Sequence, residues 1–222
     1  MAVKYLVWTT GTTITIPGDY GSLVSAAALG GGQAGTSEAT KASFGPGGIG
    51  AKYARITNAP HIKSGDILSI SIGGPGSASA GSGGDTSLKD NTGTVILLAP
   101  GGNSATTAVG SLINSGGTPG GGATPNGGGG SSAGSSAGTG NNGSNPTGAT
   151  SPGYLADGKT QIGAGGNGGV TSANGNPGQG YGAGGGGAAN ATGNHVGGAG
   201  YQGVILFGYT QAAGRNRGII IA

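Results

Sequence analysis

The chain has no cysteine among its 222 residues, so neither disulfides nor thiolate metal sites contribute to its fold. It also has no apolar stretch near the roughly 20 residues that a membrane-spanning helix needs. The first ten residues carry one lysine and a short apolar run, which is not the pattern of a secretory signal. We therefore expect synthesis in a cytoplasm and release by a route other than ordinary secretion.

Charge is scarce as well: 7% of the residues are charged, and the formal net charge is +3. The basic residues are scattered, and only Arg215 and Arg217 lie close together, so nothing indicates a nucleic-acid partner. Low charge also counts against disorder, since disordered chains usually stay solvated through net charge.

Glycine is abundant, with 59 glycines and 10 prolines in the chain. Such a composition without a strict period is typical of disordered or low-complexity segments. The alternative is a folded chain that buries glycine-rich backbone. The strand-like segments that flank the glycine tracts, together with the low charge, favour this second interpretation.

The first hundred residues and the end of the chain predict β structure. Alternation and β-branched residues indicate strands, and no sustained helical period is present; residues 25–29 contain helix formers, but glycine follows at once. The predicted strands are Tyr5–Trp8, Thr12–Ile16, Lys52–Thr57, Leu68–Ile72, Val95–Leu98, Gly203–Phe207 and Ile219–Ile221.

Between residues 116 and 200, glycine runs alternate with nearly uncharged polar segments, of which Ser131–Ile162 is the longest. Collagen is excluded because glycine does not recur at every third position, and silk-like Gly-Ala alternation is absent. A bundle of polyproline-II-like glycine helices, with three residues per turn, accepts such runs. We expect buried glycines such as Gly165 and Gly185 not to tolerate valine, and Gly143 and Gly148 to tolerate serine.

The sequence shows no group of residues with the spacing and context of a nucleotide-binding, metal-binding or catalytic motif. Two matches to G-x-G-x-x-G, from Gly163 and from Gly180, occur outside any strand-turn-helix unit and are expected by chance in so glycine-rich a chain. His61 and His195 have no carboxylate at ligand spacing, which argues against a metal site. Asp85 and Asp90 flank Lys89 in what we interpret as a turn. We predict no catalytic residue, no metal and no cofactor.

The polar segments contain serine, threonine, asparagine and isolated tyrosines, a composition typical of binding surfaces. Within the longest segment, Tyr154 and Leu155 are the best candidate anchors; a simpler alternative is that Tyr154 covers the base of a loop. Further candidates for contact with a receptor are Asp157, Lys159, Val170, Asn194 and His195. Tyr181 and Tyr201 adjoin glycine runs, so packing against the bundle is expected for them.

The opening YLVWTTGTTITIPGDYGSLVSAAALGGG, the glycine runs and the terminal strand together resemble the adhesin at the tip of the long tail fibre of T-even-type bacteriophages. The resemblance covers essentially the whole chain. It implies a non-enzymatic protein of the virion, made in the bacterial host cytoplasm. It also implies one copy on a trimeric distal tail-fibre protein, binding an outer-membrane porin-type protein or lipopolysaccharide.

The resemblance further implies a mostly β and irregular fold with few or no helices. Residues 1–115 would form a β-rich attachment domain, residues 116–202 a polyglycine II sandwich with receptor-binding loops, and residues 203–222 strands that return to the body. Ser131–Ile162 would be a principal receptor loop. The lattice glycines would include Gly120, Gly121, Gly128, Gly129, Gly165, Gly166, Gly178, Gly184, Gly185 and Gly198.

The fibre-attachment surface is assigned to the large apolar residues near the start, Tyr5, Leu6 and Trp8, which could equally fill an N-terminal core. Three other functions stay open. A polyglycine-bundle ice-binding protein would need a flat regular face, and a fibre-assembly chaperone would be absent from mature virions. A glycan-hydrolysing tailspike would need paired carboxylates.

Overall fold

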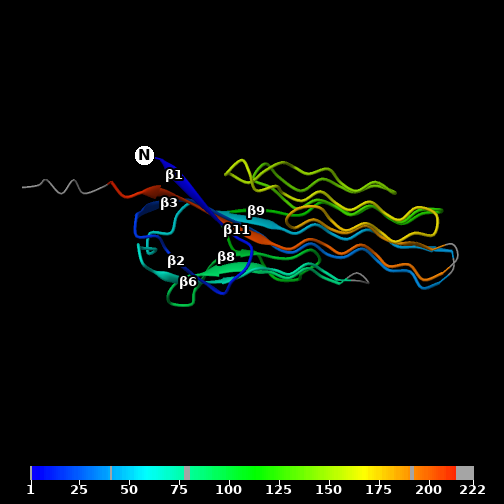
Figure 1. The fold of residues 1–222 in the computed structure, drawn as a ribbon, viewed down its shortest axis with the longest axis horizontal. Helices are drawn as coiled ribbons and strands as arrows, with labels where there is room; N and C mark the ends of the chain where they lie inside the picture. Colours follow the sequence, from blue (N-terminus) through cyan, green and yellow to red (C-terminus); the bar gives the residue numbers. More distant parts are fainter. Residues whose placement is uncertain (1, 41, 78–80, 191–192, 214–222) are drawn as a thin grey trace, which may run out of the picture.

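The computed structural model describes residues 2–40, 42–77, 81–190 and 193–213. Within these ranges the chain consists of strands and irregular extended segments without any helix, which confirms the predicted mostly β and irregular class (Figure 1). None of these residues therefore forms a helix that could cross a membrane. The predicted strand Ile219–Ile221 lies outside the described residues.

A five-stranded antiparallel sheet brings the two ends of the chain together. Its strand order is β1-β11-β3-β5-β9. The bounds are Val3–Trp8 for β1, Val204–Gln211 for β11, Tyr20–Leu29 for β3, Tyr53–Ile56 for β5 and Leu112–Asn114 for β9. The last described strand, β11, thus lies between the first strand and β3, with Tyr5 opposite Gly208 and Phe207 opposite Ala26.

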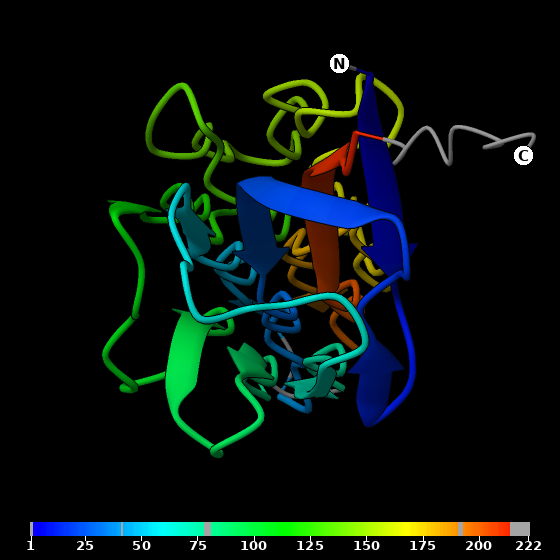
Figure 2. The same ribbon diagram turned by 90° about the vertical axis from the view of Figure 1, so that its left-hand side faces the viewer.

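A four-stranded sheet with the order β2-β6-β7-β8 packs against one face of this sheet. Its strands are β2 (Thr13–Thr15), β6 (Ile67–Ser71), β7 (Thr86–Lys89) and β8 (Val95–Ala99). A separate two-stranded pair joins β4 (Ser43–Phe44) to β10 (Ala189–Asn190). Figure 2 shows the two larger sheets at one end of the molecule, with the glycine-rich segments behind them.

The main core fills the space between the two larger sheets. Ile14, Leu68 and Leu97 of the four-stranded sheet meet Ile205 and Phe207 of β11 there. The ring centroids of Trp8 and Phe207 are 5.7 Å apart, and those of Tyr20 and Phe207 are 6.1 Å apart. This cluster closes one face of the five-stranded sheet.

The other face of the five-stranded sheet is covered by the base of the glycine-rich part. Val204 and Leu206 of β11 point there and cluster with Leu155 and Ile162. β11 is therefore buried on both faces, which explains why its sequence is a continuous apolar run rather than an alternation.

Strands β3 and β7 were not predicted from the sequence, nor were the short strands β4, β9 and β10. Residues 20–29 form β3, the longest strand, although its second half is rich in alanine. Ala26, Ala27 and Ala28 are at most 3% exposed, since their small side chains let elements approach both faces of the strand. The interpretation of the Asp85–Asp90 stretch as a turn is wrong, because Thr86–Lys89 is strand β7, paired with β6 and β8.

The remaining segments are extended threads that run side by side away from the sheets (Figure 1). We name as threads residues 30–37, 45–52, 127–134, 162–169, 183–189 and 196–203. Their amides donate to carbonyls of other threads: Gly35 donates to Gly198 over 2.9 Å, and Gly48 donates to Gly185 over 2.7 Å. Threads on both sides of residue 115 are thus interleaved in space.

The hydrogen bonds of the threads repeat every third residue. In thread 183–189, six successive amides donate to three different neighbours in rotation over 2.8–3.0 Å. The donor and acceptor pairs are Gly184 to Ser131, Gly185 to Gln33, Gly186 to Asn176, Gly187 to Gly128, Ala188 to Thr36 and Ala189 to Ala173. Thread 30–37 behaves in the same way, since Gly31 and Ala34 donate to Gly84 and Gly81 of one neighbour.

Close approach of these backbones leaves no room for side chains. A Cβ on Gly165 would lie 1.9 Å from the Gly130 carbonyl oxygen, and a Cβ on Gly185 would lie 1.9 Å from that of Gly198. Nine of the ten glycines assigned to the lattice would bring a Cβ within 3.0 Å of an atom of another segment. Gly121 is the exception, since a Cβ on it would meet no atom within 4 Å.

The expectation that Gly143 and Gly148 tolerate serine is wrong. A Cβ on Gly143 would lie 2.3 Å from the Gly129 carbonyl oxygen, and one on Gly148 would lie 2.1 Å from that of Gly165. Both residues belong to segments packed on neighbouring threads, although the surrounding sequence is polar and poor in consecutive glycines.

We predict that Gly185→Ala lowers the free energy of unfolding by about 3 kcal/mol or more, because the added methyl overpacks a backbone contact. Gly121→Ala is the matched control and should change it by less than about 0.5 kcal/mol. Urea unfolding followed by circular dichroism measures both. Equal midpoints for the two variants would contradict the packing described above.

Asp19 ties the two terminal strands together at the sheet end. Its carboxylate accepts hydrogen bonds from Lys4 Nζ at 2.7 Å, from Gln211 Nε2 at 2.7 Å and from the Tyr209 hydroxyl at 3.0 Å. The hydrogen bond from Lys4, followed by those from Gln211 and Tyr209, lowers the pKa of Asp19 from 3.8 to about 2.

We predict that this clamp adds stability that is present above pH 4 and is lost as the pH falls toward 2. The carboxylate binds its proton less readily in the folded chain than in the unfolded chain, so protonation favours unfolding. The melting temperature of the unmodified chain should exceed that of Asp19→Asn at pH 6, and the difference should shrink between pH 4 and 2. A difference that does not depend on pH would argue against an ionic clamp.

Candidate binding surface

The threads end in turns at two opposite ends of the molecule (Figure 1). The sheet end holds the five-stranded and four-stranded sheets and the turns 135–138, 154–161 and 180–182. The far end, at the right of Figure 1, gathers the described residues 36–40, 42–44, 123–126, 170–174, 190 and 193–195. Of the residues predicted to bind a receptor, Val170, Asn194 and His195 lie at the far end, whereas Tyr154, Leu155, Asp157 and Lys159 lie at the sheet end.

One half of the far end is built around a bridge between Glu38 and His195, whose amides and carbonyls pair at 2.9 and 3.0 Å. Asn190 Nδ2 donates to the Glu38 carbonyl at 3.0 Å from 152 positions away in the sequence. Asn174 Oδ1 accepts from the Val196 amide at 3.0 Å and lies 3.4 Å from His195 Nδ1. Backbone and amide contacts therefore hold three separate turns together.

The other half joins the turn 123–126 to the turn 170–174. Asn126 and Val170 form a bridge, and the Thr171 amide donates to the Pro125 carbonyl at 3.2 Å. Asn145 Nδ2 donates to the carbonyls of Asn126 and Gly121 at 3.0 and 3.1 Å. The turns at the far end are thus mutually braced.

Two exposed valines stand out among small polar residues at the far end. Val170 is 54% exposed, Val196 is 49% exposed, and Asn194 is exposed beside them. Thr171 and Ser172 have positive φ angles of 43° and 60°, so the chain turns through the left-handed region directly after thread 162–169. Sequence reasoning missed Glu38 and Asn174, because their partners are distant in the chain.

The predicted anchors Tyr154 and Leu155 have opposite environments. Tyr154 is 56% exposed on the hairpin 154–161, while Leu155 is 5% exposed and packs with Ile162 and Leu206 in the second core cluster. The assignment of Leu155 to receptor contact is therefore wrong: its side chain anchors the hairpin to the five-stranded sheet. Lys159 is exposed on the same hairpin.

Asp157 shapes that hairpin. Its Oδ1 accepts from the Lys159 and Thr160 amides at 3.0 and 2.9 Å, and its Oδ2 accepts from the Thr160 hydroxyl at 2.5 Å. Burial raises the pKa of Asp157, but these hydrogen bonds outweigh that effect, and the pKa lies below its ordinary value. Both carboxylate oxygens are therefore engaged within the turn.

Ser131–Ile162 is not a single protruding loop. Ser131, Ser132 and Ala133 are fully buried in thread 127–134, and the Ser131 hydroxyl donates to the Gly117 carbonyl at 2.6 Å while accepting from the Gly50 amide at 2.8 Å. Serine here replaces glycine inside the packed threads, because its hydroxyl hydrogen-bonds the neighbouring backbones. Only short turns of the segment reach the surface.

The three residues assigned to fibre attachment lie on opposite faces of β1, because side chains alternate along a strand. Leu6 and Trp8 pack on the main core, as the simpler alternative had it. Tyr5 is 37% exposed on the opposite face of β1, in a row with Val3 (42%) and Val7 (41%). Since β1 is an edge strand, this apolar row lies beside an unpaired backbone edge.

The acidic side chains serve mostly as turn and strand supports. Five of the six accept hydrogen bonds from nearby residues, namely Asp19, Asp66, Asp85, Asp90 and Asp157. Asp90 is buried, and its hydrogen bonds, above all that from the Thr92 hydroxyl, lower its pKa; His61 Nε2 lies 3.4 Å from its Oδ2. In the part of the chain that the structure describes, no three potential ligands gather to hold a metal.

Comparison with known proteins finds no protein-family model and no curated protein that matches this chain.

We predict that Leu155→Ala lowers the free energy of unfolding by about 2–5 kcal/mol, because it leaves a cavity under the hairpin. The adjacent Tyr154→Ala should change it by less than about 0.5 kcal/mol, since that side chain is mostly in solvent. Chemical denaturation of both variants tests the assignment, and comparable losses would show that Tyr154 is also part of the core.

Proposed function

We propose that this chain is a receptor-binding adhesin at the tip of a bacteriophage tail fibre, and that its threads form a polyglycine II sandwich. The observation that carries the proposal is that successive amides of thread 183–189 donate in rotation to three neighbouring segments, with a period of three residues. It supports polyglycine II because that helix has three residues per turn and no internal hydrogen bonds, so that each amide must find a partner in another helix.

A lattice of this kind suits adhesion because it makes turns rigid. Each turn at the far end leaves one thread and enters another, and both threads are hydrogen-bonded to several neighbours. The turns are also braced to one another through Asn174, Asn190 and Asn145. A surface that is already ordered loses little conformational entropy when it binds, which favours affinity.

Within this proposal the far end faces the bacterial receptor, and the sheet end faces the trimeric fibre. Val170, Val196 and Asn194 supply exposed contact area at the far end, and His195 lies within the braced network. The row Val3, Tyr5 and Val7 on edge strand β1 is the apolar surface available to the fibre. Tyr154 and Lys159 then belong to the fibre side rather than to the receptor side.

The receptor-facing surface favours an uncharged epitope on an outer-membrane protein. Glu38 and His195 are its ionisable residues among those described, so it offers little to the phosphates of lipopolysaccharide. Exposed valines between asparagines suit the aliphatic and amide groups of protein loops.

A non-enzymatic role is part of the proposal. The pKa values of Asp19, Asp85, Asp90 and Asp157 are all lowered, whereas a carboxylic acid that donates a proton near neutral pH needs a raised one. Their carboxylates are also used in hydrogen bonds that hold turns. This disfavours the glycan-hydrolysing alternative.

The test is adhesion of the fluorescently labelled chain to intact Gram-negative cells of a broad strain panel. For a strain that binds, the double variant Val170→Asp, Val196→Asp should weaken adhesion at least tenfold, because burying a new charge without a partner opposes contact. Tyr154→Asp, exposed at the opposite end, is the matched control and should bind as the unmodified chain does.

Outer-membrane vesicles used as competitors separate the receptor classes. Competition that is lost after protease treatment of the vesicles supports a protein receptor, whereas competition by purified lipopolysaccharide contradicts it. Adhesion that is weakened by Tyr154→Asp but not by the far-end variant would reverse the orientation. Absence of adhesion to every strain would argue against an adhesin.

A further inference from the structure

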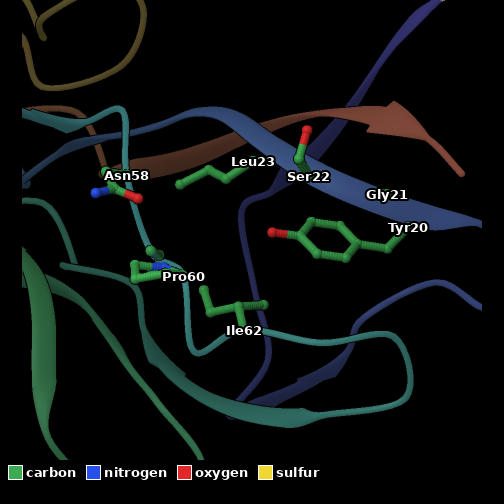
Figure 3. A pocket seen from close by; sticks show the side chains of 8 residues that line it. Tyr20, Gly21, Ser22, Leu23, Asn58, Pro60 and Ile62 are labelled. Atoms are coloured by element: carbon green, nitrogen blue, oxygen red, sulfur yellow. The ribbon is translucent and has the colours of Figure 1, made fainter.

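Two surface hollows lie beside the sheets, and they differ in whether their polar groups are free. The first is lined by Tyr20, Ser22, Leu23, Asn58 and Ile62, and measures about 150 Å³. Figure 3 shows the Ser22 hydroxyl pointing away from this hollow, where it hydrogen-bonds Thr210 at 2.7 Å. With that hydroxyl engaged, the first hollow offers fewer free groups to a ligand than the second, which is also larger.

The second hollow lies where the two larger sheets meet the threads. The loop 9–12 between β1 and β2, the end of β6, and the extended segment that follows β6 form its walls, and Gln202 of thread 196–203 closes one side. Its volume is about 360 Å³. That is at the lower end of the range for small-molecule sites, about 300–1,000 Å³.

Five polar side chains at this hollow have no partner among the residues that the structure describes. Thr9, Thr10, Thr12, Ser71 and Gln202 line it, and none of their side chains hydrogen-bonds another described residue. Elsewhere the described serines and threonines frequently bond backbone or each other, as Ser131 does with Gly117 and Gly50. The hollow thus concentrates hydrogen-bonding groups that are available to a ligand.

The apolar part and the charge of the hollow restrict the ligand further. Ile72 and the small exposed part of Ile70 (5% exposed) give the hollow an apolar part, and Gly73 and Gly74 add backbone without side chains. No charged residue lines the hollow among those described. A ligand that matches this lining has an apolar face, several hydroxyls around its rim and no net charge, because a buried charge without a partner would be costly.

We propose that this hollow binds a neutral hexose unit, whose C–H face packs on the apolar lining contributed by Ile70 and Ile72 and whose hydroxyls bond the threonines and Gln202. The site is distinct from the far-end surface, and it does not depend on the adhesin proposal. The hexose is either a free sugar or a residue of a neutral polysaccharide; the chemistry of recognition is the same for both.

The experiment is an amide chemical-shift titration of the full ¹⁵N-labelled chain with glucose, galactose and mannose. For at least one of them, the resonances of residues 9–12, 70–74 and 202 should move together with a dissociation constant on the order of millimolar, as expected for a small ligand with few contacts. N-acetylneuraminate and inorganic phosphate are charged probes and should leave those resonances in place.

Gly74→Val should weaken the binding at least tenfold by filling the hollow, because a Cβ at Gly74 meets no atom within 4 Å and the fold has room for it. Gly18→Val is the matched control, since its Cβ also meets no atom within 4 Å and it lies outside the hollow. Thr10→Val with Thr12→Val, which removes hydroxyls at nearly constant volume, should have the same effect as Gly74→Val.

The proposal is overturned if no neutral hexose moves these resonances at 100 mM, a concentration of roughly a hundred times a millimolar constant. It is equally overturned if Gly74→Val and the threonine variant bind as well as Gly18→Val, or if the charged probes bind as tightly. A neutral oligosaccharide of the best hexose distinguishes the two sources: tighter binding than the monosaccharide assigns the site to a polysaccharide, and equal binding assigns it to a single terminal or free sugar.

Discussion

The fold depends on one constraint: each buried backbone amide of a thread must donate a hydrogen bond to a carbonyl of a neighbouring segment. An unpaired buried amide costs about 1–3 kcal/mol, so a small fraction of missed pairings would unfold a domain of ordinary stability. Pairing on several sides requires backbones to approach more closely than side chains allow. A Cβ on Gly32 would lie 1.8 Å from the Ala183 carbonyl oxygen, for example. Glycine is the residue that meets this requirement, although each ordered glycine costs roughly 0.5–1 kcal/mol relative to alanine.

The sheets supply what the threads lack. Glycine threads bury little apolar area, whereas the core between the two larger sheets buries Leu68, Leu97, Ile205 and Phe207. Because β11 follows thread 196–203 and lies between β1 and β3, the threads are tied to this core at their sheet end. The second cluster, in which Leu155 and Ile162 cover Leu206, extends the attachment to a hairpin between threads. The apolar core and the hydrogen-bonded threads therefore form one continuous structure.

This arrangement separates two surfaces with different chemistry. The far end presents short turns that are braced by asparagine side chains and carry exposed valines, while the exposed tyrosines Tyr5 and Tyr154 lie at the sheet end. The composition of the polar segments favours a binding surface that contains tyrosine, and such a surface is found at the sheet end. The proposed receptor binding depends on the exposed valines among the braced turns of the far end.

The sequence alone determined the β strands that alternate or are continuously apolar, because burial on one or both faces imposes those patterns on β6, β8 and β11. It also determined that the glycine runs would be packed, since a chain with so few charges and so much glycine must bury its backbone.

Only the tertiary structure decided which residues are exposed. Leu155 and Tyr154 are adjacent in the same polar segment, yet one is in the core and the other in solvent. Ser131 is buried within a packed thread without being glycine, whereas Gly121 is a glycine whose added Cβ would meet no atom within 4 Å. A turn lies at one end or the other according to how many threads precede it and where each of them reverses direction. No local sequence pattern specifies that number.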